Sequence, residues 1–153
     1  MLIPRLLDVA AITCLKPTGE IFDPDDNSSD FYFNFKRDAF GFYIEDHHDT
    51  ESEEVTEKEH VAFLTFWLSM YVFCTRSIQV AKFLRTLAIQ LHERRKIFLR
   101  KLILGYLYES LNQGVTEMKT QGKSLLVYGP TWLFQFWLIA TFKSKLDIFL
   151  PED

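Results

Sequence analysis

The sequence has only two cysteines, Cys14 and Cys74, and they lie sixty residues apart. Two thiols at that separation make neither a disulfide framework nor the paired spacing of a zinc motif. This scarcity excludes the class of small, disulfide-stabilised secreted domains and favours a reducing compartment. The N-terminus agrees with this interpretation, because no continuous apolar segment precedes Asp8 that could serve as a secretory signal.

The sequence also lacks an apolar run that could cross a membrane. Residues 61–75 contain no charged side chain, but they fall short of the ~20 residues that a transmembrane helix needs. Residues 125–142 are long enough, but Gly129-Pro130 interrupts them. Because proline removes a backbone donor and clashes with the preceding turn, this run is better divided into a short extended piece and a helix. We expect no membrane span.

The residue sets that enzymes need are missing as well. No second histidine follows His92-Glu93 at the spacing of a zinc protease, and no Gly-flanked serine resembles a nucleophile elbow. Gly122-Lys123-Ser124 resembles a phosphate-binding loop, but Glu117 stands where that motif requires its first glycine. Cys74 lies among aromatic residues, which is typical of a small core hydrophobe. We therefore predict a protein that is not an enzyme and has no cofactor and no metal site.

What the sequence does contain is a large supply of apolar and aromatic side chains. Hydrophobic residues make up 48% of the chain and aromatic residues 16%, with 15 Phe among them. This content excludes wholesale disorder, and each buried aromatic ring removes ~150–250 Å² from water. At 153 residues the chain most simply forms one domain, residues 1–153.

The apolar residues recur at three- and four-residue steps, which predicts amphipathic helices. The most apolar stretch, residues 60–74, follows a predicted capping box of Thr56 and Glu59, and we expect it to form a buried central helix. Further helices are predicted at residues 5–14, 77–91, 96–112 and 131–143, with a polar connection at residues 114–124. The predicted fold is mainly α, a compact multi-helix bundle.

Two segments depart from the helical pattern. Short aromatic runs near residues 30–44 predict either short strands or an irregular segment that packs into the core, and if they were exposed they could stack on nucleotides. Residues 45–56 are acidic and almost free of bulky side chains, which predicts a mobile loop. The loop contains His47-His48, but no other histidine lies three or four residues away, so an incidental pair is favoured over a metal site.

The net charge of −4 conceals a strong asymmetry. Residues 1–75 hold 15 acidic and 5 basic residues, whereas residues 76–153 hold 12 basic and 6 acidic residues. The two halves either form solvated faces that attract one another or provide a basic docking surface for an acidic partner or nucleic acid. The candidate surface consists of the eight basic residues of the segment 76–101: Arg76, Lys82, Arg85, Arg94, Arg95, Lys96, Arg100 and Lys101.

Four blocks of the sequence together resemble the plant mobile domain. They are LLDVAAITCLKPTGE at residues 6–20, EHVAFLTFWLSMYVFC at 59–74, LGYLYESL at 104–111 and GPTWLFQFWL at 129–138. This family is also labelled aminotransferase-like and is related to the MAIN and MAIN-like proteins. The resemblance covers most of the chain outside the acidic loop, and the order of the second and fourth blocks is its most specific feature.

The resemblance implies a nuclear plant protein of a class shared between transposable elements and host genes. Relatives of this kind are associated with transposon silencing, control of gene expression and meristem maintenance, and they act with a protein phosphatase 7-like partner. The aminotransferase label gains no support from the residues, because no lysine lies in a recognisable pyridoxal-phosphate setting. We expect a non-catalytic protein-interaction module, and the alternative is a nucleic-acid-binding module that uses the basic segment 76–101.

Overall fold

The computed structural model describes residues 3–16, 18–26, 33, 35–48, 50, 53–76, 79–122, 124 and 127–143. Within these residues the chain forms α1 (Leu6–Thr13), α2 (Phe40–His47), α3 (Glu57–Trp67), the π-helical turn η1 (Leu68–Val72), α4 (Leu84–His92), α5 (Leu99–Gln121) and α6 (Thr131–Phe142). The described part contains no β-sheet, only the isolated bridges Glu20–Ile97 and Ala39–Gln79. The prediction of a mainly α fold is confirmed.

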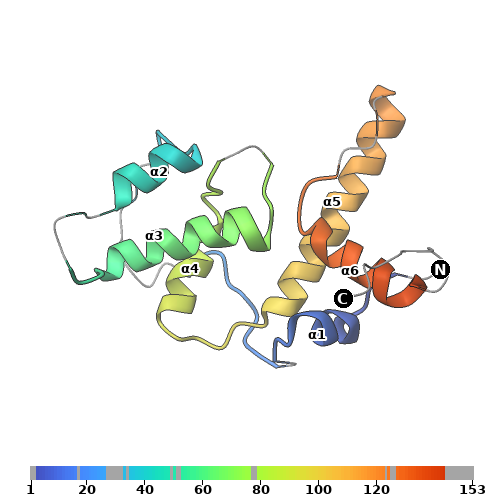
Figure 1. The fold of residues 1–153 in the computed structure, drawn as a ribbon, viewed down its shortest axis with the longest axis horizontal. Helices are drawn as coiled ribbons and strands as arrows, with labels where there is room; N and C mark the ends of the chain where they lie inside the picture. Colours follow the sequence, from blue (N-terminus) through green and yellow to red (C-terminus); the bar gives the residue numbers. More distant parts are fainter. Residues whose placement is uncertain are drawn as a thin grey trace, which may run out of the picture.

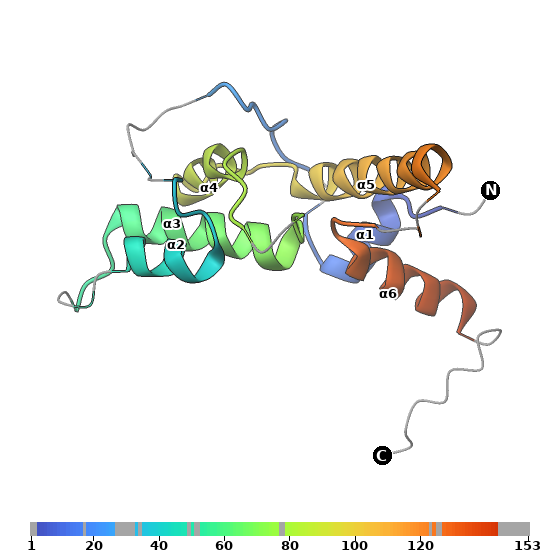
Figure 2. The same ribbon diagram turned by 90° about the horizontal axis from the view of Figure 1, so that it is seen from above.

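The helices form two groups that lie side by side (Figure 1). In the first group, α3 packs extensively against α4 and also contacts α2. In the second group, α1 contacts both α5 and α6. Figure 2 shows the same division from above, with α4 over α3 in one group and α5 over α1 and α6 in the other.

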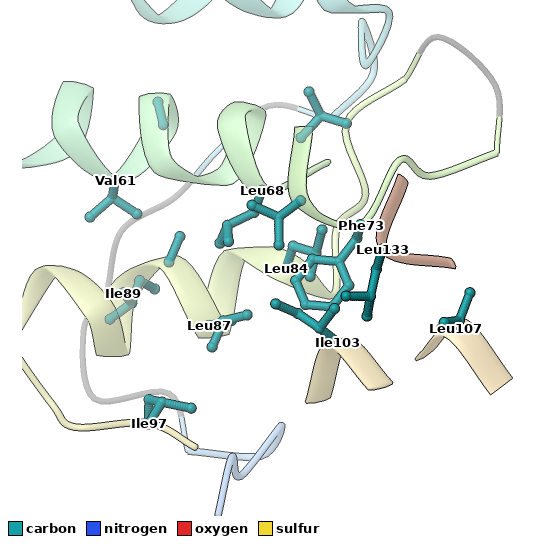
Figure 3. Packing of buried hydrophobic residues seen from close by; sticks show 14 of the residues in the cluster. Val61, Leu68, Phe73, Leu84, Leu87, Ile89, Ile97, Ile103, Leu107 and Leu133 are labelled. Carbon is teal, nitrogen blue, oxygen red and sulfur yellow. The ribbon is translucent and has the colours of Figure 1, made fainter. Parts of the chain in front are cut away.

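One hydrophobic core joins the two groups (Figure 3). Val61 from α3 and Leu87 from α4 are completely buried in the first group. Ile103 from α5 and Leu133 from α6 extend the same cluster into the second group, and Phe73, just after η1, lies between them. Each of these apolar side chains stabilises the fold by ~1.5–3 kcal/mol relative to an exposed one.

A short backbone ladder ties the segment after α1 to the connection between α4 and α5. The Glu20 N–H donates to the Lys96 carbonyl at 2.7 Å, and the Phe98 N–H donates to the Glu20 carbonyl at 2.8 Å. Gly19 permits this close approach, because a Cβ at this position would lie 2.5 Å from the Lys96 carbonyl oxygen. The N-terminal segment is thereby fixed to the junction of the two helix groups.

Three of the predicted helices begin where the sequence indicates. The helix predicted at residues 5–14 is α1, and the Arg5 N–H donates to the Asp8 carboxylate at its start, at 2.7 Å. The Thr56 hydroxyl accepts a hydrogen bond from the Glu59 N–H at 3.2 Å, which confirms Thr56 as the N-cap of α3. The helix after Gly129-Pro130 is α6.

The described residues of the aromatic segment near residues 30–44 are irregular up to Ala39, as the sequence predicted. Residues 40–44, by contrast, form neither a strand nor a loop but the start of α2. The Tyr43 and His47 rings stack at 4.2 Å between centroids, one helical turn apart, and Phe40 meets Phe66 of α3 edge to face at 5.2 Å. These contacts between rings one helical turn apart, and with α3, stabilise a helix here although the local sequence alternates aromatic and small residues. Most of the first aromatic run lies outside the described residues.

The bounds of α4 and α5 also differ from the prediction. α4 begins at Leu84 rather than at residue 77, because the Val80 N–H pairs with the Asp38 carbonyl at 2.8 Å and holds this segment extended. Ser77 itself lies outside the described residues. α5 continues through the predicted polar connection to Gln121, and Gly122 ends it with a left-handed φ of 61°. Its two interior glycines, Gly105 and Gly114, each cost only ~1 kcal/mol and do not end the helix.

The acidic segment 45–56 is not a loop throughout, since Glu45–His47 form the last turn of α2. Arg37 binds two of these carboxylates, Asp46 at 2.8 Å and Glu45 at 3.1 Å. Residues 49, 51 and 52 lie outside the described part, so the predicted mobility of this segment stays a prediction. No described helix is both long and apolar enough to cross a membrane.

Candidate functional site

An apolar groove of about 700 Å³ lies where four segments of the chain meet. Its walls come from α1 and the residues that follow it, from the end of α3 with η1, from the start of α5, and from α6. The residues that line it are Ile12, Thr13, Leu15, Trp67, Tyr71, Val72, Leu99, Ile103, Trp132, Phe136, Ile139 and Ala140. We call this site the interhelical groove.

The interhelical groove exposes large side chains that the core does not cover. Tyr71 and Phe136 are each 55% exposed, and Trp67 is 41% exposed. Single exposed hydrophobic residues are common on protein surfaces, but these rings line one concavity together with Ile139. A contiguous exposed apolar surface of this kind is typical of an interaction site.

The π-helical turn shapes one wall of the groove. In η1 the Phe73 N–H donates to the Leu68 carbonyl at 2.8 Å, five residues back instead of four. The Thr75 N–H then reaches the Ser69 carbonyl at 3.0 Å. This widened turn lies between Trp67 and the end of the helix, and it contains Tyr71, which lines the groove. The sequence predicted one central helix over residues 60–74, but the structure divides this stretch into α3 and the π-helical turn η1.

Two hydrogen bonds hold the opposite wall, α6, against η1. The indole Nε1–H of Trp132 donates to the Val72 carbonyl at 3.0 Å, and the Gly129 N–H donates to the Cys74 carbonyl at 3.0 Å. Cys74 has a left-handed φ of 45°, and its partial burial raises the pKa of its thiol. These two hydrogen bonds fix the start of α6 beside η1.

The electrostatic character of the groove is neutral. None of its twelve lining residues bears a charge, and its polar groups are the hydroxyls of Thr13 and Tyr71 and the Trp132 indole. The Trp132 N–H is already engaged by Val72. The groove can therefore bury an apolar segment, and its lining offers no cation to a phosphate.

Two residues of the predicted basic surface pair with acidic side chains of the chain itself. Arg76 pairs with Glu117 at 3.4 Å and lies 4.9 Å from the Tyr128 ring centroid. Arg95 binds both Asp26 and Glu20, and the hydrogen bond to Asp26 raises the pKa of Arg95. These two cations are already occupied within the chain by acidic side chains.

Arg100 corrects the prediction most clearly, because it was expected to face solvent and is only 3% exposed. Its Nη1 donates to the Leu6 carbonyl at 3.4 Å, and its guanidinium lies 5.6 Å from the Phe98 ring centroid. Its Nε has no partner among the residues that the structure describes. Arg100 joins α5 to α1 and is inaccessible to any partner.

The other predicted residues are more accessible, but they lie in different surroundings. Lys82 lies 5.7 Å from the Phe35 ring centroid, and Lys101 lines a smaller cavity beside Glu109. Arg94 and Lys96 are exposed in the turn between α4 and α5, and Arg85 is half-buried in α4. Only Arg94 and Lys96 remain as neighbouring, exposed members of the predicted surface.

Sequence reasoning did not find the interhelical groove. The sequence shows that residues 131–142 contain no charged residue, but only the structure shows that just Leu133 and Trp137 of this helix are buried. The sequence also gave no sign of two side-chain pairs between distant segments, His48 with Glu59 at 3.0 Å and His60 with His92 at 2.9 Å. Within the described residues, no group of three or more His, Cys, Asp or Glu could hold a metal ion.

One family model, described as Plant mobile domain, matches residues 27–146. The match includes α2 to α6 and therefore three of the four walls of the groove, while α1 precedes it. No curated protein and no solved structure was found to match the chain.

Proposed function

The chain belongs to the plant mobile domain family, and from this premise we propose that it is a non-catalytic module that binds another protein in the plant nucleus. The family resemblance associates such a module with transposon silencing, control of gene expression and meristem maintenance. The partner that the resemblance suggests is a protein phosphatase 7-like protein. The observation that supports a protein-binding role is the interhelical groove.

The chemistry of the groove favours one kind of occupant, an apolar helical segment of the partner. Helices recognised in grooves insert large apolar side chains spaced at one helical turn, and the partly exposed rings of Trp67, Tyr71 and Phe136 suit such contacts. Aromatic residues dominate the energetics of many protein interfaces. The uncharged lining disfavours a polyanion, because phosphate contacts depend on Lys and Arg.

The test compares groove variants with a matched surface variant in binding to a recombinant protein phosphatase 7-like protein. Tyr71→Glu and Phe136→Glu each place a carboxylate in the groove, and Val55→Glu places one at a site that is 72% exposed and outside it. We expect each groove variant to weaken binding by ~10-fold or more, since burying an unpaired charge costs more than ~1.4 kcal/mol. Val55→Glu should bind like the unaltered chain.

Each alternative outcome has a distinct meaning. If the groove variants bind like the unaltered chain, the groove is not the docking site. If the unaltered chain does not bind the phosphatase-type protein at all, the partner is wrong, and affinity purification from plant nuclei with the same variants identifies the correct one. Sedimentation of the chain alone tests for a second copy: self-association that Phe136→Glu abolishes would replace the partner protein by a homodimer.

Nucleic-acid binding through the segment 76–101 is the second candidate function. The neighbouring, exposed side chains of Arg94 and Lys96 favour it, whereas the internal pairing of Arg95 and the burial of Arg100 reduce the charge available. Binding of this kind should weaken steeply with rising salt. A gel-shift titration with the unaltered chain and the double variant Arg94→Glu/Lys96→Glu tests it, and no shift at low salt would exclude it.

A further inference from the structure

The outward side of α5 carries an exposed glycine between two opposite charges. α1 and α6 lie together on one side of α5 (Figure 2), and Ile103 and Leu107 of α5 are buried. Lys101, Gly105 and Glu109 are all exposed, and they follow one another at four-residue steps. Residues four apart lie on the same face of a helix, so these three residues form one row along α5. The row is about 12 Å long, at a rise of 1.5 Å per residue.

An apolar cavity of about 340 Å³ lies beside this row. One wall is the segment after α1, where Ile21 is 74% exposed and Phe22 is half-buried, and the other wall is α5 with Gly105. A Cβ added at Gly105 would meet no atom within 4 Å, so the helix surface is open at this point. Because glycine allows another backbone to approach closely, this open apolar surface suits a helix that crosses α5.

The charges of the row select the helix that fits. Lys101 lies four residues before Gly105 and Glu109 lies four residues after it, so the row is complementary to itself when it is reversed. Two copies of α5 that cross antiparallel at Gly105 place Lys101 of each copy against Glu109 of the other. A parallel crossing would bring like charges together, which is unfavourable. A surface that is complementary to itself in this way is what a two-fold symmetric dimer requires.

We propose that this face of α5 is a homodimer interface, in which two chains cross antiparallel at Gly105. Helices that interdigitate rows of four-residue spacing cross at about −50°, and glycine permits an axial distance at the short end of the ~8–10 Å range. Ile21 and Phe22 are covered by the other copy and supply apolar burial. Within the described residues neither Lys101 nor Glu109 forms an ion pair, so both are available to the other copy. Because exposed ion pairs add little affinity, these charges chiefly determine the direction of the crossing.

Sedimentation equilibrium of the full chain tests for this dimer. We expect the unaltered chain to form dimers at concentrations of ~100 μM, an affinity typical of a small and transient interface. Gly105→Gln should raise the dissociation constant of the dimer by ~10-fold or more, because a side chain at the crossing separates the two helices. This variant should fold, since the added atoms meet open space and glutamine is a better helix former than glycine. Circular dichroism checks its helix content.

Two control variants separate this interface from other surfaces. Gly41→Gln is the matched control, because Gly41 is an exposed glycine of α2 at which a Cβ would also meet no atom within 4 Å. Phe136→Glu controls for the interhelical groove, which contains neither Gly105 nor the two charged residues of the row. Both controls should dimerise like the unaltered chain.

Charge reversal tests the antiparallel direction. Lys101→Glu and Glu109→Lys should each weaken the dimer, because each places like charges opposite one another across the crossing. The double variant Lys101→Glu/Glu109→Lys exchanges the two charges and should dimerise like the unaltered chain. An equal mixture of the two single variants should form mixed dimers, since one chain then carries only acids at the two positions and the other only bases.

The proposal is overturned if the unaltered chain stays monomeric at these concentrations or if Gly105→Gln dimerises equally well. It is also overturned if Gly41→Gln or Phe136→Glu loses the dimer to the same extent as Gly105→Gln, or if the double charge exchange does not restore what the single reversals remove.

Discussion

α4 and α6 show how differently two helices of one domain use their apolar residues. α4 includes Arg85 and His92, yet six of its nine residues are buried. α6 contains no charged residue, yet only two of its twelve residues, Leu133 and Trp137, are buried. The helix with the more polar sequence is thus the more completely covered one.

The difference follows from the neighbours of each helix rather than from its composition. α4 lies against α3 along its length and also touches η1. α6 contacts α1 on one side, and its Phe136 and Ile139 point into the interhelical groove instead of into a packed core. An apolar face that the fold leaves uncovered costs solubility and gives no stability, which is why we interpret it as a binding face.

The largest expected effect tests this comparison directly by truncating one side chain in each helix. Leu87→Ala in α4 removes a completely buried side chain and should lower the free energy of unfolding by ~2–5 kcal/mol, through lost burial and a cavity. Phe136→Ala in α6 removes a larger side chain that is 55% exposed, and it should cost less than ~1 kcal/mol. Urea unfolding measures both values.

Equal losses of unfolding free energy for the two variants would contradict the contrast between α4 and α6, because they would mean that Phe136 is buried in solution. A concentration-dependent loss for Phe136→Ala would mean instead that a second copy covers α6. The Leu87→Ala value also controls for the assay, since it shows the size of loss that true burial produces in this chain.

Most of the helices could be predicted because residues close together in the sequence mark them. Apolar spacing located α1, α3 and α6, and the Thr56 cap and the Gly129-Pro130 pair marked where two of them begin. Such signals depend on residues within one or two turns of each other. These local signals failed where contacts between distant residues determine the structure. An example is the extended segment before α4, where the Val80 N–H donates to the Asp38 carbonyl.

The candidate site was beyond sequence reasoning for the same reason. The groove combines four separate segments, and its shape depends on a π-helical turn that no local pattern of the sequence revealed. The charge pattern pointed to a basic surface, but charge counts do not reveal that Arg100 turns inward or that Arg95 meets Asp26. Exposure of an apolar face is a property of packing, and only the folded arrangement shows it.

A smaller effect should appear at high pH, where a buried side chain of α2 loses its proton. Tyr43 of α2 is 1% exposed, and burial raises the pKa of its phenol to about 12, with the nearby Thr65 hydroxyl offsetting part of the rise. Its oxygen completes no well-formed hydrogen bond within the described chain. Because the neutral phenol is favoured in the folded state, its contribution is fully present below pH ~10 and is lost as the pH rises towards 12.

We expect this loss to amount to ~2–3 kcal/mol of unfolding free energy, measured by urea unfolding at several pH values between 9 and about 12. Tyr43→Phe removes the titrating group and should flatten that part of the profile. Some pH dependence should remain in the variant, because burial also raises the pKa of Tyr106 and Tyr108 on α5. If Tyr43→Phe shows the same pH dependence of the unfolding free energy as the unaltered chain, the Tyr43 phenol of the unaltered chain is in contact with water.

The smallest expected effect compares the N-termini of a capped and an uncapped helix. The Thr56 hydroxyl accepts the Glu59 N–H of α3, so Thr56→Ala should cost ~1 kcal/mol of unfolding free energy. α6 begins after Pro130 with no side-chain cap, and Thr131→Ala at its first position should change stability by ~0.5 kcal/mol or less. Thermal and urea unfolding of the two variants provide the measurement. If Thr131→Ala costs as much as Thr56→Ala, the start of α6 depends on a side-chain cap like that of α3. The hydrogen bonds that Trp132 and Gly129 make with η1 and Cys74 would then not be what holds the start of α6.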